Sequence, residues 1–196
     1  AVQPVSVPVP TLPAPVSKTI KDQIATTRIY RVWTIPGLDN PEYLPLQMAG
    51  AVLGGLASSR LDDALVRQQQ LAVSVSASTS IFAQGGQFEV FADVKPGTDP
   101  AKVSAALDAE VARFLAQGPT QDELERAATT FAAGQIRALE SVGGGSGKAP
   151  TLAEGLLYQH DAGAYRKELD AAAALTPAQV RDVPRKWLSR PTFALT

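Results

Sequence analysis

Residues 53–77, LGGLASSRLDDALVRQQQLAVSVSA, constrain the fold most, because their apolar spacing changes from that of a helix to that of a strand. Leu61 and Leu65 lie four residues apart, which is the spacing of one apolar helical face. Apolar residues then recur at every second position, which places them together on one side of a strand: Leu71, Val73, Val75 and Ala77. The stretch therefore predicts a short helix, capped by Ser58 or Ser59, that leads into a half-buried strand.

A second alternating run follows a glycine turn at residues 84–86. We expect residues 71–79 and 87–94 to pair as an antiparallel hairpin, because two alternating runs joined by a glycine-containing loop are typical of that structure. Four side chains of this hairpin are expected to face helices: Val73, Val75, Phe88 and Val90. Residues 27–35, TRIYRVWTI, are β-branched and aromatic, with apolar positions on both faces, which predicts a central strand. The run at 193–196 is also strand-like.

Helical patterns occupy most of the remaining chain. Residues 41–53 have apolar positions four apart, with Asn40 as the expected cap. Thr120 and Glu123 form a capping-box sequence that opens a long helix. Further helices are expected at the apolar face of Val103, Leu107, Val111 and Phe114, after a cap at Thr151, at the alanine run near Leu169, and from Thr176-Pro177. Pro184 is expected to kink or split the last helix.

The order of these elements is strand, two helices, two strands, several helices and a last strand. This order lacks the regular alternation of a doubly wound sheet. It predicts an α+β fold, in which an antiparallel-rich sheet has helices packed mainly on one face.

Residues 1–24 contain five prolines among valines. Prolines at this density block helices and favour extended polyproline geometry. We expect a linker here, with a recognition segment for an aromatic groove as the alternative, and a single α+β domain over residues 25–196. Because the chain stops within a strand-like run, we also expect it to be a piece of a longer protein.

Composition excludes several classes of function. Hydrophobic residues make up 45% and charged residues 19% of the 196 residues, as in ordinary globular proteins. The formal charge of −1 and the absence of a dense basic cluster predict no nucleic-acid partner. The chain has no cysteine, which excludes disulfides and thiolate chemistry. No apolar run approaches the roughly 18 residues of a membrane span. The compartment is not fixed by these observations, and a periplasmic or exported parent is one expectation.

A glycine-rich stretch before Lys148 invites comparison with a phosphate-binding loop. It consists of Gly143, Gly144, Gly145 and Gly147 with one serine. A Walker loop needs a glycine separated by four residues from its Gly-Lys pair, and a Ser or Thr after the lysine. Those positions hold Val142 and Ala149, so the sequence predicts a mobile loop between helices rather than a nucleotide site.

Candidate catalytic groups are few. His160 is the only histidine, whereas a hydrolytic zinc usually takes three protein ligands, commonly including two histidines. No G-x-S-x-G sequence marks a serine nucleophile. Several carboxylates lie at expected helix starts or on outer faces and are interpreted as solvated: Asp62, Asp63, Asp122, Glu123 and Glu125. We therefore predict no catalytic residue and no metal ligand in this chain.

Residues 53–77 also resemble the segment LGGGMSSRLFxxLRExxGLAYSVSA of the pitrilysin/insulinase (M16) zinc metallopeptidases. The matches follow in order and without gaps: Gly54-Gly55, Ser58-Ser59-Arg60-Leu61, Leu65, Leu71-Ala72 and Ser74-Val75-Ser76-Ala77. The resemblance covers residues 25–196 and implies the same α+β fold as the pattern of elements.

The resemblance also implies where the family's chemistry lies. One domain of these peptidases carries zinc on an HxxEH motif, and a different domain supplies an Arg and a Tyr, seven residues apart, that hold the substrate carbonyl. In this sequence the Arg and Tyr positions hold Val66 and Val73, and no HxxEH is present. Arg67 is one place away, and a shift of one residue turns a helical side chain by about 100°. Both parts of the chemistry are therefore absent from this chain.

The resemblance thus implies a non-catalytic domain of a zinc-dependent metallopeptidase. It would follow the zinc-bearing domain, form part of the wall of the peptide chamber, and contact other domains of the same chain or a partner half. Zinc would be bound by another domain of the parent protein, and the glycine stretch at 143–147 is a candidate flexible chamber loop. Two alternatives stand beside this interpretation: a structural or assembly subunit of the same fold without proteolytic activity, and an unrelated binding module.

Overall fold

The computed structural model describes residues 7–142, 145 and 147–196. Within these residues one sheet has the strand order β1-β5-β2-β4-β3. The strands are β1 (Val16–Lys18), β2 (Arg28–Pro36), β3 (Ala72–Ile81), β4 (Gly85–Val94) and β5 (Phe193–Leu195). Among these described strands, β1 and β5 pair in parallel, and the other neighbours pair in antiparallel fashion. The predicted antiparallel-rich sheet is confirmed.

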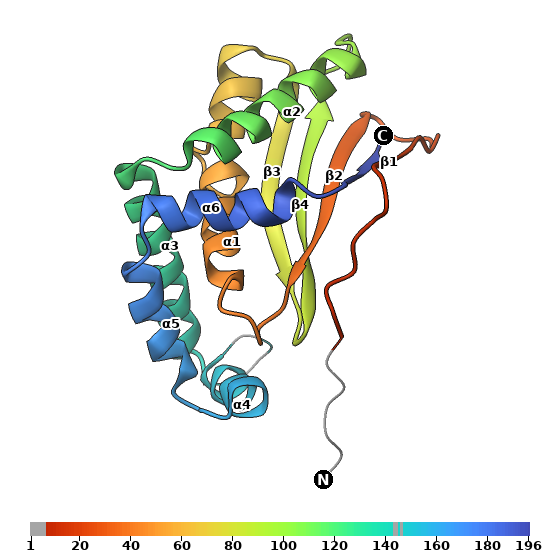
Figure 1. Ribbon diagram of the computed structural model, residues 1–196. Helices are drawn as coiled ribbons and strands as arrows, with labels where there is room; N and C mark the ends of the chain where they lie inside the picture. Colours follow the sequence, from red (N-terminus) through yellow and green to blue (C-terminus); the bar gives the residue numbers. More distant parts are fainter. Residues whose placement is uncertain (1–6, 143–144, 146) are drawn as a thin grey trace.

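The helices gather on one side of this sheet (Figure 1). They are α1 (Tyr43–Gly50), α2 (Pro100–Gln117), α3 (Gln121–Glu140), α4 (Lys148–Gln159), α5 (Ala164–Ala173) and α6 (Pro177–Leu188). Two π-helical turns, η1 (Ala51–Gly55) and η2 (Asp62–Gln68), follow α1. The core lies between the sheet and these helices, so the α+β fold with helices mainly on one face is confirmed.

Every second residue of the central strand β2 points into this core. Ile29, Trp33 and Ile35 are buried on the helix side, between neighbours β4 and β5. Arg31 occupies the same side and is only 7% exposed. A buried charge needs a paired and hydrogen-bonded partner, because leaving it unpaired in the interior costs several kcal/mol.

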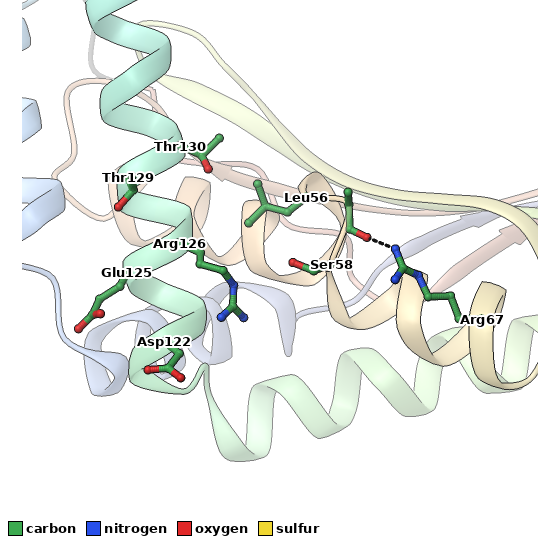
Figure 2. Close-up of a pocket in the computed structure, with 9 residues that line it drawn as sticks. Leu56, Ser58, Arg67, Asp122, Glu125, Arg126, Thr129 and Thr130 are labelled. Carbon is green, nitrogen blue, oxygen red and sulfur yellow. Dashed lines mark hydrogen bonds between the residues drawn. The ribbon is translucent and has the colours of Figure 1, made fainter.

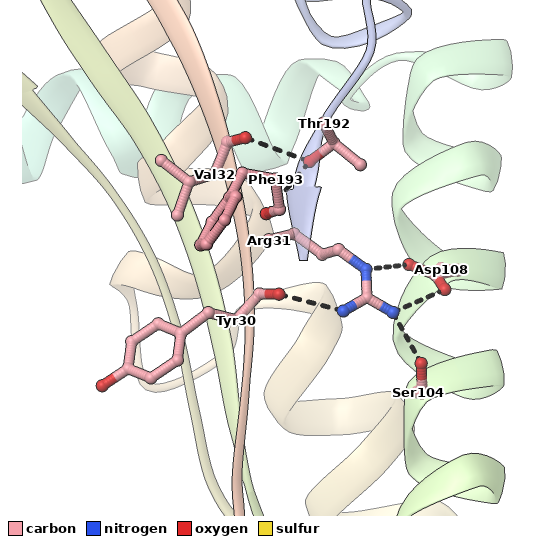
Figure 3. Close-up of polar contacts among 7 residues, drawn as sticks. All are labelled: Tyr30, Arg31, Val32, Ser104, Asp108, Thr192 and Phe193. Atoms are coloured by element: carbon pink, nitrogen blue, oxygen red, sulfur yellow. Dashed lines mark hydrogen bonds and ion pairs between the residues drawn. The ribbon is translucent and has the colours of Figure 1, made fainter. Parts of the chain in front are cut away.

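Arg31 finds its partners on α2 (Figure 3). Its Nε and Nη2 donate to the two carboxylate oxygens of Asp108, at 2.8 and 2.9 Å, and Nη2 also donates to Ser104 Oγ. The third nitrogen, Nη1, donates to the Tyr30 carbonyl at 2.9 Å. This arginine therefore fastens α2 to the centre of the sheet, a role that the sequence pattern did not indicate.

The predicted hairpin is present, but one of the four side chains expected to face helices lies on the outer face instead. β3 and β4 pair in antiparallel register, with Phe88 and Val90 fully buried and Val75 packed against the core. Val73, in contrast, is 51% exposed. The register shifts between Ala72 and Ser74, so a β-bulge places Val73 on the outer face. The expectation that Val73 faces helices is therefore wrong.

Helix starts differ from their expected positions in three places. α1 begins at Tyr43, although Asn40 still accepts the Glu42 amide through Oδ1 at 2.9 Å. No serine side chain caps η2: its N-cap residue is Leu61, and the Ser59 hydroxyl is buried without a hydrogen-bond partner among the described residues. α4 begins at Lys148, so Thr151 lies inside it and donates to the Gly147 carbonyl.

The starts of α3 and α6 agree with the starts that the sequence predicts. The capping box of Thr120 and Glu123 is present at the start of α3, and a second one, formed by Thr176 and Gln179, opens α6. α6 continues through Pro184 as one helix, so the expectation that this proline splits it is wrong, whereas the expected kink stays a prediction. Pro184 is buried on the inner side of this helix.

The segment expected to be a linker lies against the domain in part. Val16–Lys18 add to the sheet beside β5, and the Thr34 hydroxyl donates to the Pro10 carbonyl. These contacts hold the described part of the proline-rich segment along the β2 side of the sheet (Figure 1).

Candidate functional site

The two positions of the implied Arg/Tyr pair lie in different surroundings. Val66 is in η2 and packs, partly buried, against the hydrophobic core. Val73 is at the bulge of the edge strand β3 and faces outward. Neither side chain can donate a hydrogen bond to a substrate carbonyl. The structure therefore places an apolar surface where the resembling motif has two donors.

Arg67, the neighbouring cation, is held by local contacts. Its Nε donates to Asp62 Oδ2 at 2.7 Å. Its Nη2 donates to the Ala57 carbonyl at 2.6 Å (Figure 2). The partner lies five residues earlier because η2 is π-helical, with its residues related by i and i+5. Gln68 and Asp63 form the same kind of pair at 2.6 Å. Arg67 thus stabilises the turn before η2.

A shallow hollow of about 710 Å³ opens beside Arg67, between the loop at residues 56–58 and α3. Its charged lining residues are Arg67, Asp122, Glu125 and Arg126 (Figure 2). Two cations and two carboxylates balance one another, so the hollow has no strong net charge. It contains neither a histidine nor a cysteine, and it offers no nucleophile with an adjacent base.

The arginine of the Ser-Ser-Arg-Leu sequence has a structural role. Arg60 forms a two-point ion pair with Glu123, with both N–O distances at 2.8 Å, and donates to the Gly118 carbonyl at 2.7 Å. Its guanidinium also lies over the Phe114 ring, 5.4 Å from the centroid. Arg60 lowers the pKa of Glu123 to about 2, helped by the Thr120 amide. Glu123 is therefore paired and partly buried, and its interpretation as a solvated carboxylate is wrong.

The glycine pair of the same sequence allows a close backbone approach. A Cβ atom at Gly54 would lie 2.2 Å from the Ala77 nitrogen and 2.8 Å from the Ala77 Cβ. Only glycine lets η1 pack this closely on β3. The matched residues Gly54, Arg60 and Ala77 thus hold the helix-to-strand unit together rather than supply chemistry.

The one histidine does not form a metal site. His160 is exposed at the C-terminal end of α4, with φ of 55°. Its neighbour Asp161 is already paired with Lys167 at 2.7 Å, which lowers the pKa of that carboxyl. Among the described residues, no group of three or more histidine, cysteine, aspartate or glutamate side chains is placed to hold a metal. The donor set of this chain therefore does not fit the zinc of the resembling family.

The glycine-rich stretch is described only in part. Gly143 and Gly144 lie outside the described residues, Gly145 is exposed, and Gly147 is the buried N-cap of α4. The amides of Lys148 and Ala149 donate to the carbonyls of Ser141 and Val142. These amides are therefore already used and do not form a phosphate cradle. A role as a chamber loop stays a prediction.

Sequence comparison connects this structure to a family. Residues 1–131, two-thirds of the chain, match the family model described as the peptidase M16 inactive domain. The chain belongs to this M16 inactive-domain family. A comparison with curated proteins gave no match.

Solved structures show the same M16 fold. A protease from Helicobacter pylori aligns with a TM-score of 0.82 at 19% identity, covering 95% of this chain and 45% of that one. The M16 inactive domain from Pseudomonas fluorescens also has a TM-score of 0.82, at 18% identity, with 97% of this chain and 45% of that chain covered. Complex III2 from Candida albicans contains a similar chain, with a TM-score of 0.76 at 16% identity, covering 99% of this chain and 48% of that one. The chain thus spans less than half the length of these relatives.

The sequence did not indicate the role of Arg60. The resembling motif implies substrate contacts only at the positions of Val66 and Val73, whereas Arg60 joins the segment before η2 to α3 through Glu123. The capping-box sequence predicted the position of Glu123 correctly, but the cap accounts for the contact of Oε2 with the Thr120 amide and not for the contact of Oε1 with Arg60. No pattern in the sequence pointed to a partner 63 residues away. The described helices are each too short or too polar to span a bilayer.

Proposed function

We propose that this chain is a non-catalytic wall domain of a zinc metallopeptidase, in which another domain of the same protein binds zinc and hydrolyses the peptide bond. The observation that carries the proposal is the pair of valines, Val66 and Val73, at the two donor positions of a segment that resembles the M16 motif. Loss of a single oxyanion-type donor typically costs about 10²–10³ in rate. A domain without either donor contributes to peptide hydrolysis through contacts rather than chemistry.

A wall domain needs a surface that another domain covers. Such a surface is available on α4 and the adjoining part of α3, here called the α4 face: Ile136, Leu152, Leu156 and Leu157. Leu156 and Leu157 are 59% and 67% exposed, and Ile136 is 56% exposed. Adjacent exposed apolar side chains of this kind mark interaction sites on soluble proteins. We assign the α4 face to the contact with the neighbouring domain or the partner half.

The proposal is tested by a fluorogenic peptide assay on three proteins. These are the chain alone, the chain carrying Val66→Arg and Val73→Tyr, and the longer parent protein loaded with zinc. The first two are expected to be silent because nothing in them activates water, and the parent is expected to cleave in a chelator-sensitive way. Chelator-sensitive cleavage by the chain alone would overturn the non-catalytic assignment.

The alternative, a structural or assembly subunit, is favoured by one comparison. The similar chain from Candida albicans is part of an assembly, Complex III2. The two proposals differ in what lies elsewhere in the parent protein. An HxxEH motif in the preceding domain supports the peptidase, and a zinc-free parent that is silent in the assay supports the assembly subunit.

A further inference from the structure

A small cavity lies away from the M16 motif, among the helices at the end of the molecule that carries α4 and α5. Its volume is about 260 Å³, and most of its walls come from α1, α3, α4 and α5, with Leu38 and the end of β3 completing them. These helices lie together at one end of the layer that packs on the sheet (Figure 1). The cavity is smaller than the roughly 300–1,000 Å³ of pockets for drug-sized ligands, so it suits one small group rather than a large molecule.

The lining of this cavity is rich in acceptors and has no cationic side chain. Its polar residues include two carboxylates, Glu154 and Glu168, and three glutamines, Gln47, Gln135 and Gln159. Apolar walls are supplied by Leu38, Ile81 and Phe131. Two carboxylates without a cation in the same lining give the cavity a negative potential, which low-dielectric walls concentrate.

Glu168 is held in place by a donor from another helix. Gln159 Nε2 donates to Glu168 Oε1 at 2.6 Å. Tyr43 of α1, only 8% exposed, lines the same cavity. Burial, followed by the charge of Glu168, raises the pKa of the Tyr43 phenol, so the phenol stays a neutral donor. The carboxylate is therefore oriented before any ligand arrives.

The basic residues nearest to Glu168 in sequence are engaged elsewhere. Arg166 donates to Tyr165 Oη at 3.0 Å and lies over that ring. Lys167 pairs with Asp161. In the described part of the chain, neither Glu154 nor Glu168 takes part in an ion pair. The two carboxylates therefore keep their negative charge, which a cationic ligand would neutralise.

We propose that this cavity binds a primary alkylammonium group, either of a free small amine or of a lysine side chain. An ammonium has three donors and no acceptor, which matches a lining of carboxylate and amide oxygens. Its methylene stem packs against Ile81 and Phe131. A divalent metal fits less well, because the described residues place no third acidic or histidine ligand there. The proposal does not depend on the wall-domain function.

Binding is tested on the 196-residue chain by NMR titration with butylammonium. Amide signals of Gly155 and Ala164, which line the cavity, report on occupancy. Butylammonium is expected to give a saturable shift, and the neutral analogue 1-pentanol is expected to give none. No saturable shift with butylammonium, or equal shifts with both compounds, would overturn the proposal.

Two isosteric variants locate the site. Glu168→Gln is expected to weaken butylammonium binding about tenfold, because a charge-assisted hydrogen bond becomes a neutral one. Asp170→Asn, the same charge change on the exposed side of α5, is expected to leave the affinity unchanged. If circular dichroism shows that Glu168→Gln does not fold, Glu154→Gln on the solvent-exposed wall replaces it in the comparison. Equal affinities of the cavity variant and Asp170→Asn would refute the assignment to this cavity.

The source of the ammonium group is distinguished by two acetylated peptides that differ only in lysine against norleucine. Binding of the lysine peptide alone identifies a protein side chain as the natural ligand. Binding of free butylammonium without the lysine peptide identifies a free amine. Binding of the norleucine peptide as tightly as the lysine peptide would contradict recognition of an ammonium group.

Discussion

Arg60 and Glu123 form a two-point ion pair, with Nε–Oε1 and Nη2–Oε2 distances of 2.8 Å, that joins the segment just before η2 to the first turn of α3. Their side chains are only 13% and 19% exposed. Pairs with this geometry and burial contribute more to stability than exposed salt bridges, most of which contribute about 0–1 kcal/mol. The pair thus links two segments that the sequence predicts as separate helices.

Glu123→Gln is therefore expected to lower the free energy of unfolding by about 1–3 kcal/mol at pH 7. Glutamine can still complete the capping box with Thr120, so the change isolates the ion pair. Glu125→Gln on the exposed side of the same helix is the control and is expected to change stability little. Urea denaturation measures both, and equal losses would contradict the role of the pair.

The same pair predicts a pH dependence. The folded-state pKa of Glu123 is lowered from 4.5 to about 2, first by Arg60, so the unfolded chain binds the proton more readily. The stabilisation is complete above the unfolded pKa and is lost as pH falls from about 4.5 towards 2. The difference in unfolding free energy between the parent chain and Glu123→Gln should therefore shrink across this window. A difference that stays constant down to pH 2 would show that the ion pair is not its cause.

Gly54→Ala tests the close contact between η1 and β3. The added methyl group would lie 2.2 Å from the Ala77 nitrogen, so the backbone must move, and we expect a loss of about 3 kcal/mol or more. Gly134→Ala is the matched control, because a Cβ there meets nothing within 4 Å in the middle of α3. That control is expected to raise stability by about 0.5–1 kcal/mol through helix propensity. Denaturation midpoints that shift in the same direction for both variants would refute the steric explanation.

Gln70 has a positive φ of 53°, at the position where the resembling motif has glycine. A left-handed conformation costs a residue with a side chain about 1–2 kcal/mol. Glycine removes this cost, but its greater conformational freedom in the unfolded state offsets part of the gain. Gln70→Gly is therefore expected to stabilise the chain by about 0.5–1 kcal/mol. Gln69→Gly, one residue earlier with φ of −85°, is expected to destabilise it instead. Thermal unfolding of the two variants distinguishes strain at residue 70 from a general effect of glycine.

The sequence predicted those features that depend on period and on local caps. Alternation alone located the β3–β4 hairpin, and the capping box of Thr120 and Glu123 located the start of α3. Periodicity failed at Val73, because a bulge adds one residue without changing the pattern of side chains. It also failed at the partner of Arg60, since long-range pairing has no signature in a single sequence. The sequence did not indicate the cavity around Glu168 for the same reason, because its walls come from four helices, one strand and a loop.

Leu156→Glu tests the proposed contact of the α4 face in the longer parent protein. Leu156 is 59% exposed, so the change should leave the stability of the isolated chain within about 0.5 kcal/mol. In the parent, a charge at this contact would displace the neighbouring domain, and small misplacements of reacting groups can lower activity about 10²-fold. Phe82→Glu, at a position 68% exposed near the β3–β4 turn, is the matched control and is expected to retain activity. Peptide cleavage by the two zinc-loaded variants decides the matter: equal activity would place the domain contact elsewhere, whereas a selective loss in Leu156→Glu means that the α4 face touches another domain.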